Sequence, residues 1–223
     1  MTKEEGVFMA IYQLSEELIF PNPELSDEDG LLAVGGDLSV ERLILAYSNG
    51  IFPWYSKGEP ILWWSPKPRF VLMPEDIKIS KSMKKIIRKG EFQVTFNNDF
   101  EGVIEGCKSM RENEEGTWIT DQMKRAYIDL HNEGYALSVE TYLDGELVGG
   151  LYGVVLGRCY FGESMFSKVS NASKIALITL AQKLQELNFE FIDCQVYTEH
   201  LESMGAKMVE WNKFKFMINR GLS

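Results

Sequence analysis

Cysteine and histidine are scarce in this chain. Its 223 residues include three cysteines and two histidines, His131 and His200. An odd number of cysteines without paired spacing is typical of a reducing cytosol, and no Cys/His cluster has the spacing of metal ligands. The sequence therefore predicts a reduced protein without a metal site, and we interpret both histidines as helix-surface residues.

Long hydrophobic runs are absent as well. No apolar stretch approaches the ~18–20 residues of a membrane span, and Glu4 and Glu5 stand where an export signal would be basic. The phosphate-loop pattern G-x-x-x-x-G-K-S/T is also missing, so Gly30, Gly35 and Gly36 indicate tight turns. We expect a cytoplasmic protein that binds no membrane and carries no cofactor.

Positive charge is in deficit, with 23 Lys and Arg against 33 Asp and Glu and a formal net charge of −10. This balance disfavours nonspecific polyanion binding over the whole surface. The segment 78–90, KISKSMKKIIRKG, is a local exception: it contains Lys84, Lys85 and Arg88 and no acid. A solvated helix face and a contact with a nucleic-acid backbone are equally good interpretations of this segment.

The chain is organised around the segment from Cys159 to Gln195. Residues 159–165 have strand composition, and residues 189–196 alternate between apolar and polar as a strand does. Between them, leucines recur at three- and four-residue steps along one predicted helix face: Leu177, Leu180, Leu184 and Leu187. A strand–helix–strand unit this short predicts a right-handed crossover between parallel strands.

Three polar side chains lie near the ends of these strands. Because side chains alternate along a strand, Asp193 and Gln195 point the same way while Ile192 and Cys194 point the other. Ligands of such sheets bind beyond the strand ends, near Glu163, Asp193 and Gln195. These three residues form the candidate catalytic site.

Structural roles are the competing interpretation of the same three residues. Asp193 or Gln195 alone, at a strand end, is adequately explained by hydrogen bonds to loop amides. Glu163 has an alternative of its own, as a buried carboxylate paired with Arg158 or Lys174.

Aromatic residues and prolines are concentrated between residues 51 and 70. The prolines argue against a regular central strand there and predict a stiff loop that carries Trp54, Tyr55, Trp63 and Trp64. Indoles on such a loop serve as core packing or as a platform on which a base can stack.

Several further elements follow from local signals. Residues 40–49, 100–110 and 121–132 are predicted helices, and an antiparallel meander is predicted from residue 136 to residue 165. Terminal strands are expected around Lys207–Trp211 and Phe214–Ile218.

The element order predicts the fold class. Three antiparallel strands, a helix and a further parallel strand are typical of the N-acetyltransferase-type (GNAT-type) fold, a mixed α/β (α+β) architecture with a mixed sheet. A coenzyme A-dependent N-acyltransferase is one function of such a fold. The helix-start segment SKVSNASK lacks the glycine with which such enzymes usually bind the pyrophosphate, which argues against that function.

The sequence resembles the bacterial leucyl/phenylalanyl-tRNA–protein transferases. The resemblance extends from Phe20 to Gly205, and the order and spacing of its strings are highly specific. The strings are GLLAVGGDLS (30–39), AYSNGIFPWY (46–55), ILWWSPKPR (61–69), TWIT (117–120), LVGGLYG (147–153), FGESMFS (161–167), NASK (171–174) and IDCQ (192–195).

The resemblance implies a domain organisation and an activity. It implies a small N-terminal domain, assigned to residues 1–70, and an acetyltransferase-like catalytic domain, assigned to residues 71–223. Such enzymes transfer Leu or Phe, and less well Met, from aminoacyl-tRNA to the α-amino group of proteins that begin with Arg or Lys. The transfer marks those proteins for degradation. We expect a monomer.

The resemblance also implies roles for individual residues. Asp193 and Gln195 correspond to the catalytic pair and Glu163 to the site glutamate, while Trp54 and Trp118 correspond to the indoles that hold the terminal adenosine. We expect Asp193 to fix an amine and accept charge, and Gln195 to align a proton. The implied amino-acid pocket consists of Leu151, Tyr160, Met165, Leu180, Leu184 and Ile192.

The sequence departs from the family pattern at two places. Leu137 replaces a frequent histidine, and Glu210-Trp211 replaces a proline and a basic residue. The first change concerns packing, whereas the second affects the predicted contacts with tRNA. A module that binds RNA or peptide and has lost its chemistry is the non-enzymatic alternative.

Overall fold

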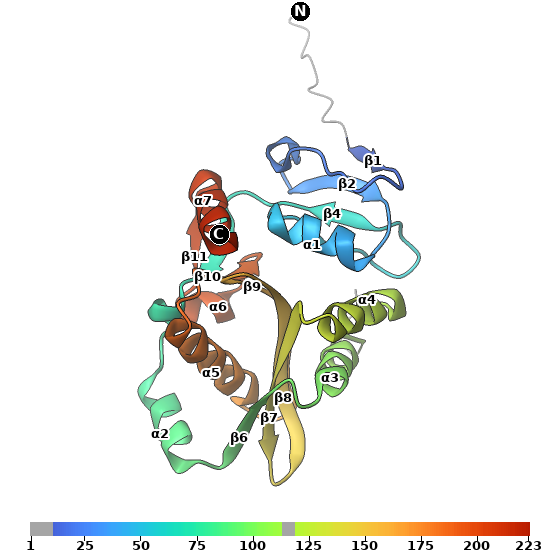
Figure 1. Ribbon diagram of the computed structural model, residues 1–223. Coiled ribbons are helices and arrows are strands. Elements are labelled where there is room, and N and C mark those ends of the chain that lie inside the picture. Colours follow the sequence, from blue (N-terminus) through green and yellow to red (C-terminus); the bar gives the residue numbers. More distant parts are fainter. Residues whose placement is uncertain (1–10, 113–118) are drawn as a thin grey trace, which may run out of the picture.

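The computed structural model describes residues 11–112 and 119–223, which form two β-sheets (Figure 1). The smaller sheet has the strand order β1 (Tyr12–Leu14), β2 (Leu31–Gly35), β4 (Leu62–Trp64), β3 (Phe52–Pro53). The larger sheet has the order β11 (Lys207–Val209), β5 (Arg69–Leu72), β10 (Phe191–Gln195), β9 (Cys159–Ser167), β8 (Glu146–Leu156), β7 (Ala136–Leu143), β6 (Phe92–Phe96).

The larger sheet is mixed, as the sequence predicts. Strands β7, β8 and β9 form an antiparallel meander. Helix α5 (Ala172–Glu186) then leads to β10, which pairs with β9 in parallel, with Ile192 opposite Tyr160. The predicted order of three antiparallel strands, a helix and a parallel strand is therefore confirmed, and so is the mixed α/β class.

Helices cover both faces of this sheet (Figure 1). Helix α5 packs on β7, β8 and β9, and its buried side chains form one hydrophobic cluster with Met83 of α2 (Lys81–Lys89). On the other face, α3 (Phe100–Glu112) and α4 (Asp121–Asn132) share a second cluster with α1 (Val40–Ser48).

The second cluster also contains side chains of the smaller sheet, so it extends across residue 70. The domain boundary at that residue stays a prediction.

Local capping explains why the helices begin where the sequence predicts. The side-chain oxygens of Ser39 and Thr120 accept hydrogen bonds from the backbone N–H three residues later, at the starts of α1 and α4. Ser80 caps α2 in the same way, and Gly90 ends it in the left-handed conformation. These contacts satisfy backbone groups that a helix end leaves unpaired.

The C-terminal segment differs from the prediction. Strand β11 is present, but the expected strand at Phe214–Ile218 lies inside helix α7 (Trp211–Leu222). Trp211, Phe214 and Ile218 are buried at three- and four-residue steps, which is the period of a helix face and not of a strand. Glu210 occupies the N-cap position of this helix.

The proline-rich segment also differs from the prediction. Trp63 and Trp64 lie on β4, a central strand of the smaller sheet, and not on a loop. This is possible because Pro60 and Pro66 flank the strand and do not interrupt it. Trp63 is fully buried, and its indole N–H donates to the carbonyl oxygen of Gly35.

The glycines of β8 allow close packing on both sides of the strand. A Cβ atom at Gly149 would lie 2.5 Å from the Cβ of Ala172 in α5, and one at Gly153 would lie 2.2 Å from the carbonyl oxygen of Phe161. At both positions a neighbouring atom lies too close to leave room for a side chain.

Two further observations concern the described residues alone. None of their helices combines the length and apolar character needed to cross a lipid bilayer. No group of three or more His, Cys, Asp or Glu side chains among them is arranged to hold a metal ion.

Candidate active site

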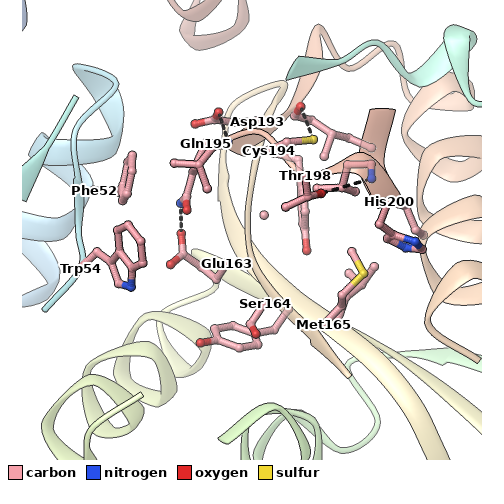
Figure 2. Close-up of a pocket in the computed structure, with 18 of the residues that line it drawn as sticks. Phe52, Trp54, Glu163, Ser164, Met165, Asp193, Cys194, Gln195, Thr198 and His200 are labelled. Atoms are coloured by element: carbon pink, nitrogen blue, oxygen red, sulfur yellow. Dashed lines mark hydrogen bonds between the residues drawn. The ribbon is translucent and has the colours of Figure 1, made fainter. Parts of the chain in front are cut away.

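A cavity of about 330 Å³ lies where the end of the smaller sheet meets β9, β10 and the short helix α6 (Glu199–Ser203). Figure 2 shows Phe52 and Trp54 on one side of it, Glu163 and Gln195 near its centre, and Thr198 and His200 on the far side. The cavity therefore combines a polar centre with walls from several distant segments. The predicted residues Glu163, Asp193 and Gln195 all line it.

Glu163 is the acceptor of three side-chain hydrogen bonds. The hydroxyl of Tyr47 from α1 donates to its Oε1 at 2.7 Å, and that of Tyr127 from α4 donates to its Oε2 at 2.6 Å. The side-chain amide of Gln195 donates to Oε1 at 2.8 Å. The alternative pairing with Arg158 is not found, because Arg158 pairs with Glu190. Glu163 therefore lies in a neutral environment of hydroxyl and amide groups.

The number of protons in this cluster favours a protonated Glu163. The hydroxyl oxygens of Tyr47 and Tyr127 are also 2.6 Å apart, so three short oxygen–oxygen contacts join the two phenols and the carboxylate. Two hydroxyl protons can fill only two of these contacts. A proton on Glu163 allows all three contacts to be filled in a cycle: Glu163 then donates to Tyr47, Tyr47 donates to Tyr127, and Tyr127 donates to Oε2 of Glu163.

Burial acts in the same direction. It raises the pKa of Glu163 from 4.5 to about 7, although the hydrogen bonds from Tyr127, Tyr47 and Gln195 lower it in part. The negative charge of Asp193 also raises it. Glu163 is therefore a carboxyl group that takes up and releases a proton near neutral pH.

Asp193 has a different environment. Its carboxylate is fully buried and accepts two hydrogen bonds from Arg69, at 2.8 Å from Nε and 2.7 Å from Nη2. It also accepts the backbone N–H of Gln195 at 2.9 Å. The expectation that Asp193 itself holds an amine does not agree with this geometry, because the carboxylate is already neutralised by Arg69.

Gln195 reaches the site by a break in the strand. Its φ is +62°, and the pairing of β10 with β5 shifts by one residue between Asp193 and Gln195. The simple alternation of side chains therefore ends before Gln195. Its amide turns to Glu163 (Figure 2), while the Asp193 carboxylate turns to Arg69. The three residues line one cavity, as expected from the sequence. Gln195 reaches it through the register shift and its positive φ, and not through the alternation of side chains along a regular strand.

The apolar part of the cavity contains four of the six predicted pocket residues. Leu151, Tyr160, Met165 and Ile192 line it. Leu180 and Leu184 are buried in the hydrophobic cluster behind that wall. The cavity is lined instead by Leu177, one turn earlier on α5, and by Leu201 of α6. The predicted helix therefore reaches the cavity one turn earlier than Leu180 and Leu184, and the donor-pocket role of these residues stays a prediction.

The other predicted residues have varied positions. Trp54 lines the cavity with 43% of its surface exposed, whereas Trp118 lies outside the described residues. Cys194, expected to point away from Asp193 and Gln195, and His200, expected on the helix surface, both line the cavity. Burial and then the charge of Lys174 lower the pKa of His200.

Sequence analysis did not identify three residues that contact Glu163 or Asp193. Tyr47, Arg69 and Tyr127 have no motif of their own, although Tyr47 and Arg69 lie within AYSNGIFPWY and ILWWSPKPR. The available signal was a polar side chain at a helix or strand position that the hydrophobic pattern predicts to be buried. Only the fold shows that they meet Glu163 and Asp193.

Comparison with known proteins gives two family-model matches and several closely related sequences. The family model "Leucyl/phenylalanyl-tRNA protein transferase" matches residues 71–219, and the model of the N-terminal domain of that family matches residues 36–67. The transferase of this name from Syntrophus aciditrophicus is 56% identical over 215 residues, which cover 96% of this chain and 90% of that protein. The one from Pseudomonas entomophila is 51% identical over 216 residues, with 96% of each chain covered.

The chain belongs to the leucyl/phenylalanyl-tRNA–protein transferase family. It is therefore an aminoacyltransferase, and the expectation drawn from its sequence motifs is confirmed.

Solved structures give weaker similarities. A ribosomal-protein-alanine N-acetyltransferase from Brucella melitensis biovar Abortus 2308 has a TM-score of 0.41 and 12% identity, covering 54% of this chain and 94% of its own. An aminoglycoside acetyltransferase from an uncultured soil sample has a TM-score of 0.39 and 17% identity, covering 51% and 84%. Similarity at this level carries no argument about function.

The raised pKa of Glu163 predicts a pH-dependent stability difference between the wild type and Glu163→Gln. Between pH 4.5 and about 7 the folded wild type keeps the Glu163 proton that the unfolded chain has lost. Its free energy of unfolding should therefore fall, relative to that of Glu163→Gln, by about 3 kcal/mol as pH rises through this window. Urea unfolding of both proteins at several pH values measures this, and a difference that does not change with pH would contradict the assignment.

Proposed function

We propose that this transferase moves Leu or Phe, and less well Met, from aminoacyl-tRNA to the α-amino group of proteins whose first residue is Arg or Lys. The product carries a new peptide bond and is marked for degradation in the cytoplasm. Family membership supports aminoacyl-tRNA and protein as the two substrates. The observation that carries the chemistry is Glu163, a buried carboxyl group with a pKa of about 7 beside Gln195 in the wall of the cavity.

The reaction requires a neutral amine and the removal of one proton. The amine nitrogen attacks the ester carbonyl carbon, a C–N bond forms, and the ester C–O bond breaks to release the ribose hydroxyl of the tRNA. The α-amino group has a pKa of about 7.7–8.0, so roughly a quarter of it is neutral near pH 7.4. Positioning of the two substrates is therefore the larger contribution, at ~7–11 kcal/mol.

Glu163 is suited to accept the proton that the nitrogen loses after it has attacked as the neutral amine, and to return that proton to the ribose oxygen as the ester C–O bond breaks. Its pKa of about 7 is close to that of the amine, which is the condition for efficient proton transfer near neutral pH. Asp193 is less suited because Arg69 occupies its carboxylate. Gln195 donates its amide N–H to Glu163 and has its carbonyl oxygen to hold the amine.

The apolar end of the cavity is suited to the donor side chain. Leu151, Met165, Leu177 and Ile192 supply aliphatic and thioether surface there. Such a pocket separates donors that differ by one methylene by only ~1–3 kcal/mol, so transfer of Met is expected as well. The half-exposed indole of Trp54 supplies a face on which the terminal adenine of the tRNA stacks.

A basic helix is the proposed contact for the tRNA backbone. Lys84, Lys85 and Arg88 are exposed on α2, which lies on the α5 side of the larger sheet (Figure 1). The interpretation of this face as merely solvated remains the alternative.

A transfer assay tests the proposed function. Purified protein is incubated with radiolabelled Leu-, Phe- or Met-tRNA and with peptides that begin with Arg, Lys or Asp. We expect labelled product from Leu- and Phe-tRNA with the Arg and Lys peptides, less from Met-tRNA, and none with the Asp peptide.

Two outcomes would overturn the proposal. Bound aminoacyl-tRNA without turnover would indicate a binding module. Stabilisation by acetyl-CoA in a melting assay, without transfer from tRNA, would indicate a coenzyme A-dependent acyltransferase.

The role of the basic helix predicts a change in salt dependence. Replacing Lys84, Lys85 and Arg88 by Ser should weaken tRNA binding and reduce the slope of log K against log salt, because each lost phosphate contact contributes ~0.9 or less. Filter binding at several salt concentrations measures the slope. Lys213→Ser, an exposed change on α7, is the control; an unchanged slope in the triple variant would place the tRNA elsewhere.

A further inference from the structure

The guanidinium group of Arg69 lies between two aromatic rings. Arg69 is on β5 and has no exposed surface. Its central carbon is 4.8 Å from the ring centroid of Phe52 on β3 and 5.0 Å from that of Phe214 on α7. Cation–π contacts of this kind favour a fixed cation over an aromatic face. The smaller sheet and the C-terminal helix therefore hold Arg69 between them.

Arg69 in turn fixes the residues at the end of β10. Its two parallel hydrogen bonds set both the position and the plane of the Asp193 carboxylate. The same carboxylate oxygen that accepts from Nε also accepts the backbone N–H of Gln195. That bond holds Gln195 at a φ of +62°, a conformation that costs free energy for a residue with a side chain. The result is an amide placed 2.8 Å from Glu163.

Stability alone does not explain this ion pair. Removing two charges from water is costly, and apolar replacements of a buried pair are often neutral or stabilising. Here Nη1 of Arg69 is also buried without a hydrogen-bond partner among the described residues, which adds to the cost. A pair retained under these conditions indicates a role in geometry.

We propose that Arg69 is a positioning residue of the transfer reaction: held between Phe52 and Phe214, it orients the Asp193 carboxylate and, through it, the Gln195 amide that faces the cavity. The inference rests on the proposed function for its kinetic test. Helix α7 contributes Phe214, so this inference assigns that helix a part in arranging the site.

A double variant separates positioning from stability. Arg69→Met and Asp193→Asn each leave one partner alone, so both single variants should lose thermal stability. The double variant Arg69→Met/Asp193→Asn has no buried charge, so its melting temperature should recover towards that of the wild type. Its kcat should nevertheless remain about 10²-fold lower, because Gln195 is no longer held in place. The Kd for Leu-tRNA should stay within about twofold of the wild-type value, since the donor pocket is unchanged.

A matched control removes a different ion pair of α7. Arg220 on α7 binds Glu190 and lies more than half exposed. Arg220→Gln should lower the melting temperature and leave kcat unchanged. If the double variant has recovered its melting temperature and also transfers at the wild-type rate, Arg69 has only a structural role and the proposal is wrong.

A second measurement does not depend on activity. The side-chain NH₂ signals of Gln195, assigned by comparison with Gln195→Ala in nitrogen-15 spectra, report whether the amide is held against Glu163. We expect slow hydrogen exchange in the wild type and in Arg220→Gln, and at least tenfold faster exchange in the double variant. Equal exchange rates would overturn the role of Arg69, whereas a wild type that transfers nothing would overturn the proposed function alone.

Discussion

The hydrogen bonds to Glu163 connect parts of the chain that are far apart in sequence. Tyr47 comes from α1, Tyr127 from α4 and Gln195 from the end of β10, and all three donate to one buried carboxylate. No cation pairs with it among the described residues, so burial is compensated by hydroxyl and amide donors and by a proton near neutral pH. The packing of α1 and α4 against the larger sheet therefore also sets the chemistry of the site.

Two carboxyl groups on neighbouring strands thus have opposite environments. Asp193 is neutralised by Arg69 and is proposed to position Gln195, whereas Glu163 meets only neutral donors and is the proposed proton acceptor. Environments that differ in this way are a common means of giving two similar groups different roles. The parallel pairing of β9 with β10 brings the two groups to the same cavity.

The sequence predicts much of the fold because its signals are local. Caps at Ser39 and Thr120 and the leucine spacing of α5 mark helices that are found almost to the residue. Helix α7 was missed because its apolar residues were interpreted with the period of a strand. At the site, the motifs FGESMFS and IDCQ identify Glu163 and Gln195, whose side chains are in contact. Tyr47, Tyr127 and Arg69 could not be found, because their roles depend on contacts between segments separated by 36 to 124 residues.

The titration of Glu163 tests the central claim most directly. Carbon-13 spectra of the glutamate side-chain carboxyl groups, recorded from pH 4 to pH 9, follow its protonation, and Glu163→Gln identifies its signal. We predict a midpoint of about 7, set by burial among Tyr47, Tyr127 and Gln195. A midpoint near 4.5, the ordinary value for glutamate, would contradict the proposed role of Glu163 as the proton acceptor.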